Sequence, residues 1–464
     1  MPDSLDRMRE EVSAGGEISA ENPIERILFA KVEAWILVAL MIAGVIVLLS
    51  FGWLVQHRVN GGEKGGILAN IAVLVARFPD PVIQFLDGDA VVQPQRLKHA
   101  AALDAGYPTI GEYGDRGTLI LSSYSDDYEV STVSLLDLQT GETRHRWAPP
   151  VEAINSVTRF TDAQNLKRNY RTQHPLLMEN GDLVFTSGEG PLVRIDACGG
   201  IVWTIDRHFH HSIERDSDGD FIVPLVTGAA TGTAPPLRDD GFAKVSPDGE
   251  ILAEWSVTDI LLRNGYHGLV YGVGPWESDR IHLNDAEPIL HSDGFVEEGD
   301  IALSIRHLST VLLYRPKTDE IVWLETGPWL NQHDVDYQGD GVFTVFGNDS
   351  VRGPEAKDMA LRGYSTIWQY DMKTGETGPF LEMKNPKVFT ATQGLHRVLP
   401  NGDVFVEEQN AGLLYRLTAN GVAWQHSNRL DSEHIGAVHW SRYLTQQESH
   451  FPWLASLSCT RTEG

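Results

Sequence analysis

The sequence contains few cysteines, and this shortage excludes one class of protein. Only Cys198 and Cys459 occur among the 464 residues. Two cysteines allow at most one disulfide, so they exclude a small scaffold built on disulfides, and they match no CxxC metal-binding pattern. The sequence leaves open whether these two cysteines pair.

Basic residues are also scarce. The chain has 37 Lys and Arg against 64 Asp and Glu, which gives a formal net charge of −27. A surface of this sign repels the phosphate backbone of nucleic acids, so nucleic acid is not expected as a partner. An anionic ligand would need a local region of positive charge.

One apolar run is long enough to cross a membrane. Residues 35–55, WILVALMIAGVIVLLSFGWLV, carry no charge and end near tryptophans, as a transmembrane helix does. The 34 preceding residues are acidic and no A-x-A site follows, which favours an uncleaved anchor over a cleaved signal peptide. We expect the bilayer to hold residues 35–55 and the following body to lie on the periplasmic side of the inner membrane.

Helical periodicity is rare after the apolar run. Residues 56–109 read as a linker, in which GGILANIAVLVARF has the pattern of a short amphipathic helix. From residue 110 onward, a glycine followed by alternating apolar residues recurs six times: GTLILSSY (117–124), GDLVFTSG (181–188), GDFIVPLV (219–226), GDIALSIR (299–306), GVFTVFGN (341–348) and GDVFVEEQ (402–409). A hairpin-like turn rich in Gly, Asp and Asn and another strand pattern follow each copy.

Six copies of strand, turn and strand predict an all-β fold. We expect a six-bladed β-propeller over residues 110–445, with a tail at 1–34, a transmembrane helix at 35–55 and a C-terminal tail at 446–464. AVHWSRYL (437–444) is the candidate for closing the ring. A two-sheet sandwich would not repeat this pair of motifs six times.

Five histidines precede the glycine-entered strands: His174, His211, His282, His333 and His396. The strand before such a turn is commonly the innermost one of a blade, so we expect these imidazoles to converge on the central channel. Structural hydrogen bonding and metal binding are the competing interpretations, although no H-E-x-x-H spacing supports a metal site. The spacing alone does not decide between them.

Three motifs carry a resemblance to a known family. RIHLNDAEPI, GDIALSIRH and GPWLNQHDVDYQGDGVFTVFGND resemble the bacterial arylsulfate sulfotransferases, six-bladed propellers that are periplasmic or membrane-associated. The likeness spans residues 110–445 and is strongest over 205–350. It implies a histidine nucleophile that becomes transiently sulfated, flanked by two more histidines, an asparagine and an arginine. The matching residues are His333, His282, Asn284, Arg306 and His211, with His210 as the alternative to His211.

The chemistry of sulfuryl transfer suits these residue types. A neutral His333 would attack sulfur, Arg306 would hold sulfonate oxygens, and His211 and Asn284 would donate hydrogen bonds as negative charge develops. His282 or His211 would protonate the departing phenolate.

Other residues near these motifs have weaker functional signals. Trp329 is a candidate for stacking on the aryl ring, while Asp334 either orients an imidazole or lies in an exposed turn. His174 and His396 are expected to line the channel without chemistry. Three basic residues are candidates for its mouth: Lys167, Arg168 and Arg171.

The leading hypothesis is an anchored transferase that moves a sulfuryl group from an aryl sulfate to a phenol, without PAPS, cofactor or metal. The alternative is a catalytically silent propeller that acts as an anchored subunit or interaction platform of a membrane protein complex. A membrane complex or a homo-oligomer is compatible with either function. A metal-dependent hydrolase such as a lactonase would need channel carboxylates that hold Ca²⁺. Since the predicted channel positions are histidines, the sequence disfavours that third function.

Overall fold

The chain forms two compact units, Met1–Val91 and Val92–Gly464. The structure is a computed structural model that describes residues 33–59, 66–77, 95–98, 103, 106–161, 163–229, 237–272, 274, 277–352 and 358–459. The second unit begins earlier than the expected start of the propeller at residue 110, because the strand β1 (Arg96–Lys98) pairs with β27 (His434–Gly436).

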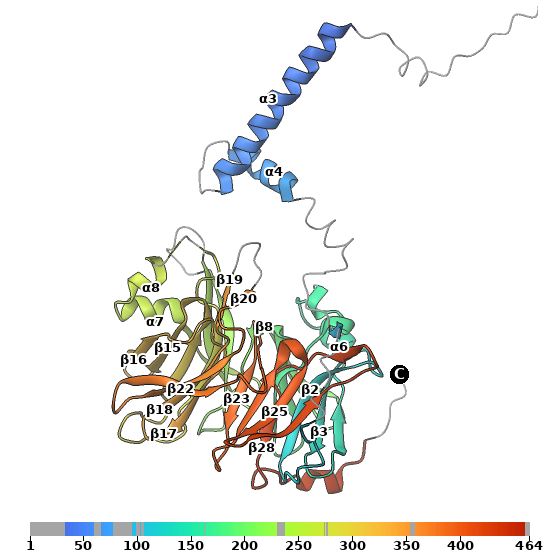
Figure 1. Ribbon diagram of the computed structural model, residues 1–464, viewed down its shortest axis with the longest axis vertical. Coiled ribbons are helices and arrows are strands. Elements are labelled where there is room, and N and C mark those ends of the chain that lie inside the picture. Colours follow the sequence, from blue (N-terminus) through green and yellow to red (C-terminus); the bar gives the residue numbers. More distant parts are fainter. Residues whose placement is uncertain are drawn as a thin grey trace, which may run out of the picture. The chain divides into compact units, whose positions relative to one another are not determined.

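The first unit contains the predicted apolar helix. Helix α3 (Ala34–Val59) includes a 24-residue stretch, Ala34–His57, with a mean hydropathy of 2.7 and no buried side chains (Figure 1). It is therefore long and apolar enough to cross a membrane. The short helix α4 (Gly66–Arg77), which the sequence also predicted, packs on α3 and buries Ala69 and Ala72.

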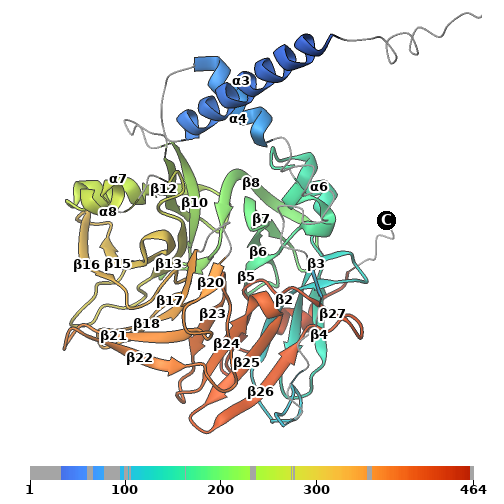
Figure 2. The same cartoon turned by 45° about the horizontal axis from the view of Figure 1, so that its top comes forward.

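The second unit is a β-propeller, as the repeats predicted. Its strands form groups of four, which we call blades 1 to 6 in chain order, arranged around a ring (Figure 2). Blade 1 consists of β28 (Arg442–Leu444), β2 (Thr118–Ser125), β3 (Val130–Asp137) and β4 (Thr143–Trp147). Blade 2 consists of β5 (Gln173–Leu177), β6 (Leu183–Thr186), β7 (Glu189–Ile195) and β8 (Ile201–His210). Blade 3 consists of β9 (Glu214–Arg215), β10 (Phe221–Ala229), β11 (Arg238–Val245) and β12 (Ile251–Ser256).

The remaining blades follow the same antiparallel order. Blade 4 consists of β13 (Leu283–Pro288), β14 (Ile301–Ile305), β15 (Thr310–Arg315) and β16 (Glu320–Thr326). Blade 5 consists of β17 (Val335–Gly339), β18 (Val342–Gly347), β21 (Thr366–Asp371) and β22 (Glu376–Glu382), with the hairpin β19 (Ser350–Arg352) and β20 (Asp358–Ala360) inserted. Blade 6 consists of β23 (Leu395–Val398), β24 (Val404–Glu408), β25 (Leu413–Thr418) and β26 (Gly421–Ser427). Blades 2 and 3 are joined into one sheet by a single pair, Phe209 with Leu225.

The sequence repeats map onto these blades in register. Each glycine-entered strand is the second strand of its blade, and each hairpin motif lies at the turn between the third and fourth strands. The predicted closing segment pairs as expected, since β28 forms an antiparallel ladder with β2. The first blade therefore takes its innermost strand from the C-terminal part of the chain.

Apolar side chains between the blades hold the ring together. Six buried clusters occur in the described propeller, and each is shared by two neighbouring blades. One of them joins Leu119 of blade 1 to Phe405 of blade 6 and so closes the ring. Alternating strand residues thus face a neighbouring blade. The innermost strands are left to carry the polar residues of the channel.

Short helices interrupt the sheets. They are α6 (Val151–Ser156), α7 (Val257–Arg263), α8 (His267–Tyr271), η1 (Ala163–Asn165), η2 (Lys167–Asn169), η3 (Arg306–Leu308), η5 (Gln409–Ala411) and η6 (Pro452–Ser456).

The C-terminal tail packs on blades 1 and 2. Trp453 lies against Trp147, and a disulfide joins Cys198, at the β7–β8 turn, to Cys459. The structure thus pairs the two cysteines whose pairing the sequence left open.

Candidate functional site

The entrance to each innermost strand has an unusual backbone. One non-glycine residue with positive φ, between 43° and 62°, lies there in every blade: His174, His211, His282, Asn331, Gln393 and Trp440. Residues other than glycine adopt this backbone conformation at a cost in free energy, and such residues are often found at functional sites. Three of the five predicted histidines therefore occupy equivalent positions. His333 and His396 do not, because they lie two and three residues beyond Asn331 and Gln393.

His333 is buried, with 1% of its surface exposed. Its Nδ1 lies 2.7 Å from Oδ1 of Asn348. The amide nitrogen of Asn348 donates to the carbonyls of Thr390 and Gln393, so its oxygen must accept from His333. His333 consequently carries its proton on Nδ1. Its Nε2 keeps a lone pair, which accepts the backbone N–H of Gln393 at 2.8 Å.

The surroundings of His333 oppose a positive charge on its ring. Burial, followed by the charge of nearby Arg306, holds the pKa of His333 well below its ordinary value. The hydrogen bonds independently define the neutral tautomer. This is the form of imidazole that has a nucleophilic nitrogen.

His211 is the nearest imidazole to His333 among the ring contacts, with centroids 6.1 Å apart. Burial, and after it the neighbouring histidines, hold the pKa of His211 well below its ordinary value. Its Nδ1 lies 2.9 Å from Nδ1 of His210, whose Nε2 is 3.7 Å from the carboxylate of Asp240. His210 therefore positions His211, and of these two rings only His211 contacts those of His282 and His333.

His282 lies on the other side of His211, with ring centroids 5.4 Å apart. Its Nδ1 is 2.7 Å from a carboxylate oxygen of Asp279, so an Nδ1–H donates to Asp279 and Nε2 is left for chemistry. Burial acts to raise the pKa of Asp279, but the hydrogen bond from His282 and nearby positive charge lower it overall. Asp279 is therefore an anionic partner, and it makes His282 the one clustered histidine with a direct carboxylate bond.

Arg306 is held beside this pair by His307. Nη1 of Arg306 donates to Nε2 of His307 at 3.0 Å, and Nδ1–H of His307 donates to the carbonyl of Asp279. His307 also stacks on His282 with centroids 4.4 Å apart. Burial lowers the pKa of His307 to about 4, so it remains neutral and accepts from the guanidinium. His307 thus holds both Arg306 and His282 in place.

Asn284 binds the backbone that precedes His333. Its amide nitrogen donates to the carbonyl of Gln332 at 3.0 Å, and its side chain is fully buried. Gln332 directly precedes His333, so Asn284 fixes the segment that carries the candidate nucleophile. One amide N–H remains for other contacts.

One prediction needs correction, and one open alternative is decided. Trp329 is fully buried in the apolar cluster between blades 4 and 5, packed with Val335 and Phe343, so it fills a contact between blades and does not reach a substrate ring. Asp334 follows the first of its two alternatives, because it orients an imidazole and does not lie in an exposed turn. It is buried and accepts both the ring N–H and the backbone N–H of His396, at 2.6 and 2.8 Å.

Sequence reasoning missed several residues of the site. Asn348, Asp279 and His307 position the predicted residues, Gln393 contributes a backbone amide, and the ring of Trp440 lies 6.1 to 6.4 Å from those of His211 and His333. Asn348 could have been recognised in FGND, because it directly follows a glycine-entered strand. Nothing in the sequence pattern marks Asp279.

The remaining candidates lie apart from the cluster. His174 and His396 line a separate acidic cavity in the channel, and Lys167 and Arg168 are exposed on η2. Arg171 is partly buried. In the described residues, three groups have the geometry to hold a metal ion: Asp279 with His282 and His307; Asp334 with Asp336 and His396; and Asp216 with Asp218 and Asp220.

The fold and site together define a β-propeller with a buried cluster of histidines around an arginine. A family model described as arylsulfotransferase (ASST) matches residues 174–429, more than half of the chain. The chain therefore belongs to the arylsulfotransferase family, and a sulfotransferase function follows at this level. The matched range contains His211, His282, Arg306 and His333.

Solved structures give only distant likenesses. A protein of unknown function from Bacteroides caccae is 11% identical, with 71% of this chain and 99% of that one covered and a TM-score of 0.47. The periplasmic gluconolactonase of Pseudomonas aeruginosa is 13% identical (71% and 99% covered, TM-score 0.39). The WD40 β-propeller domain of Doa1 is 11% identical (76% and 98% covered, TM-score 0.38). No curated protein matches the chain. These likenesses carry no argument about activity.

Proposed function

We propose that this protein transfers a sulfuryl group from an aryl sulfate to a phenolic acceptor, without PAPS, through a sulfated His333. The observation that carries this proposal is the hydrogen bonding of His333. Asn348 fixes its proton on Nδ1, so Nε2 presents a lone pair inside a cluster that also contains Arg306. A histidine with only a structural role would not need this tautomer beside an arginine.

The first displacement would begin with the release of Nε2 from the amide of Gln393. Nε2 then attacks sulfur, the N–S bond forms, and the S–O bond to the aryl oxygen breaks with its electron pair leaving on the phenolate. The freed N–H of Gln393 would lie next to the incoming sulfuryl oxygens. In the second displacement a phenol oxygen attacks sulfur and the N–S bond breaks, which restores neutral His333.

Arg306 would balance the negative charge on the sulfuryl oxygens. Transfer through a loose transition state spreads charge over these oxygens, and forked N–H donors in a buried site stabilise it. Neutral His211, with its Nδ1–H directed at His210, would present a lone pair on Nε2 to the side-chain amide of Gln393, 3.4 Å away, and so position that amide beside the sulfuryl group. Neither group needs to move a proton.

We assign the proton transfer to His282. Protonated on both nitrogens, it would donate from Nε2 to the departing phenolate while Asp279 stabilises the imidazolium. It would then remove the proton of the acceptor phenol in the second half of the reaction. His211 lacks a direct carboxylate partner, so burial opposes its protonation.

Replacing Asp279 with asparagine should expose this role. We expect kcat to fall about 10- to 100-fold with phenyl sulfate, a donor with a poor leaving group, and far less with p-nitrophenyl sulfate, whose phenolate needs little protonation. Steady-state kinetics with both donors measure the difference. Asp218→Asn, at the surface, is the matched control. Equal losses with both donors would contradict the assignment of His282 as the acid.

The shape of the Arg306 side chain should matter as well as its charge. Arg306→Lys keeps the charge but loses the fork and the bond to His307, so we expect kcat/KM to fall about 10- to 100-fold, and Arg306→Ala to cost more. The same transfer assay measures both variants. A lysine variant with wild-type activity would show that a point charge is sufficient.

We further propose that α3 holds the protein in the inner membrane with the propeller in the periplasm. The apolar span supports the anchor, and the Cys198–Cys459 disulfide supports an oxidising compartment, because such bonds are rare in the cytosol. Residues 1–34 would remain on the cytoplasmic side. Reaction of single introduced cysteines with an impermeant thiol reagent in whole cells tests this orientation.

The decisive experiment is an assay of the solubilised protein with p-nitrophenyl sulfate and a phenol, without PAPS. Release of nitrophenol that the acceptor stimulates supports the transferase. The absence of turnover by the folded wild-type protein, across several donors and acceptors, would favour a silent propeller that acts as a subunit of a membrane complex.

A further inference from the structure

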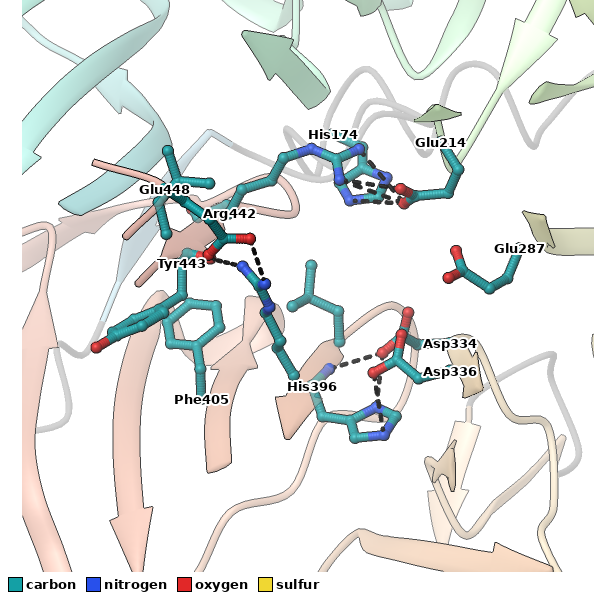
Figure 3. Close-up of a pocket in the computed structure, with 14 residues that line it drawn as sticks. His174, Glu214, Glu287, Asp334, Asp336, His396, Phe405, Arg442, Tyr443 and Glu448 are labelled. Carbon is teal, nitrogen blue, oxygen red and sulfur yellow. Dashed lines mark hydrogen bonds and ion pairs between the residues drawn. The ribbon is translucent and has the colours of Figure 1, made fainter. Parts of the chain in front are cut away.

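A second polar cavity lies in the propeller, and none of the clustered catalytic candidates lines it. It has a volume of about 290 Å³ (Figure 3). Carboxylates dominate its wall, with Glu214, Glu287, Asp334 and Asp336 beside two histidines and Arg442. The sequence pattern predicted the two histidines, His174 and His396, but not the carboxylates beside them.

The positive groups of this wall are already engaged. Arg442 lies 3.1 Å from Glu214 and Arg397 lies 2.7 Å from Glu448, so each pair neutralises itself. The two histidines are also engaged: Nδ1 of His174 accepts the backbone N–H of Ile213, and the ring nitrogens of His396 lie 2.6 Å from Asp334 and 2.8 Å from Thr344. Among the described residues of the wall, no lysine or arginine therefore remains to pair with Glu287, Asp334 or Asp336.

The three remaining carboxylates lie close together. One oxygen each of Asp334 and Asp336, and a ring nitrogen of His396, all lie within 4.8 Å of one another. Figure 3 shows the carboxylate of Glu287 pointing into the space beside them. The bonds from the ring and the backbone of His396 hold one oxygen of Asp334 in a fixed direction. Such fixed, convergent oxygens are the ligands that hard divalent cations prefer.

A fourth carboxylate gives independent support. Asp285 is only 2% exposed, and one of its oxygens has no hydrogen-bond partner. Its other oxygen accepts the backbone N–H of Val335, the residue between Asp334 and Asp336. Asp285 and Glu287 are two residues apart on β13, so they project from the same face of the strand. A buried carboxylate oxygen without a partner is costly unless a ligand satisfies it.

We propose that this cavity binds a divalent cation of the Ca²⁺ type through Glu287, Asp334 and Asp336. The cation would link β13 and β17, the innermost strands of blades 4 and 5, and through His396 also β23 of blade 6. It would therefore stabilise the ring directly below the segment that carries His333. This site is independent of the proposed transferase chemistry.

A second acidic cluster in the chain differs from this cavity, because a lysine lies among its carboxylates. Asp216, Asp218 and Asp220 also converge, but Nζ of Lys244 lies 2.7, 2.7 and 3.2 Å from their oxygens. There the protein supplies its own cation, so no metal ion is required. The surface residue Asp218 is therefore a suitable place for a control substitution.

The test is thermal unfolding of the full-length protein in detergent, treated with EDTA and then given Ca²⁺, Mg²⁺ or Mn²⁺ at about 1 mM. A cation that binds only the folded state raises Tm, and we expect a rise of about 3 °C or more with Ca²⁺. Calorimetric titration should show one site per chain. Asp336→Asn should lose the rise while keeping a Tm at least as high as that of the metal-free wild type, because a neutral amide costs no more to bury than a carboxyl group among other carboxyl groups.

The controls make the proposal falsifiable. Asp218→Asn should keep the cation-dependent rise in Tm, and Glu287→Gln should lose it. If none of the three cations raises the Tm of the wild type, or if Asp336→Asn and Glu287→Gln keep the full rise, the proposed site is refuted. Neither outcome depends on enzymatic activity, so failure here is distinct from failure of the proposed transferase.

Discussion

Substitution of His333 with alanine is expected to lower kcat/KM for aryl sulfate by at least about 10³-fold, because the proposed reaction has no other nucleophile. The side chain makes one hydrogen bond to Asn348 and one to the Gln393 amide, so its loss also leaves those groups without a partner. Steady-state release of nitrophenol measures the loss. Rapid quenching of the wild type with donor alone should trap one sulfuryl group on the peptide that contains His333.

The control for this substitution is His145→Gln. His145 lies on β4, where it bonds to the carbonyl of Ala197, far along the blade from the innermost strand. We expect wild-type kinetics from it. Circular dichroism and unfolding curves of the His333→Ala protein must match those of the wild type before the loss is assigned to chemistry. A trapped sulfuryl group on any other residue would overturn the assignment of His333.

Loss of the Cys198–Cys459 disulfide should have the largest effect on stability. The bond spans 261 residues, and closing a loop of such length in the unfolded chain is worth about 5–6 kcal/mol in the chain-entropy description. We expect Cys198→Ser, Cys459→Ser and the double variant to lose this free energy of unfolding to the same extent. Guanidinium titrations followed by tryptophan fluorescence measure it.

The position of the disulfide makes this prediction specific. It joins the C-terminal tail to the β7–β8 turn, at the outer strands of blade 2, so the histidine cluster should keep its geometry. Transfer activity of the oxidised and reduced proteins at low temperature should be equal. An additive loss from the two single variants would show that the cysteines act separately and are not paired.

The propeller could be predicted because its turns carry strong local signals. The glycines before the second strands and the Gly, Asp and Asn residues of the outer hairpins determine chain reversal, and alternating apolar residues determine which face is buried. The paired ladders follow these signals in every blade. The position of β1 could not be predicted in this way, because Arg96–Lys98 pairs with a segment more than 300 residues away.

The site was predicted less completely. His211 and His282 share a backbone position, but the sequence pattern cannot show that Asn331 and Gln393 occupy that position in blades 5 and 6, since a positive φ leaves no mark on the apolar alternation. The resemblance to known motifs predicted which residues belong to the site. Only the structure shows which of them contact one another. Asp279 joins the cluster from a loop without repeat character.

The carboxylates of the acidic cavity do have a signal in the sequence. Acidic residues alternate on β13, in NDAEP, and at the start of β17, in HDVDY. An alternation of two places both members of each pair on one strand face. The histidine pattern alone does not predict these carboxylates.

Ring closure by β28 affects when the protein becomes functional during synthesis. Trp440, which lies beside His211 and His333, belongs to the segment that leads into β28, and β28 completes blade 1 only by pairing with β2. His211 and His333 therefore leave the ribosome before Trp440, the residue against which they pack. A growing chain would remain an open arc until β28 is available to pair with β2, so the histidine cluster gains its last wall only after the other five blades have been synthesised.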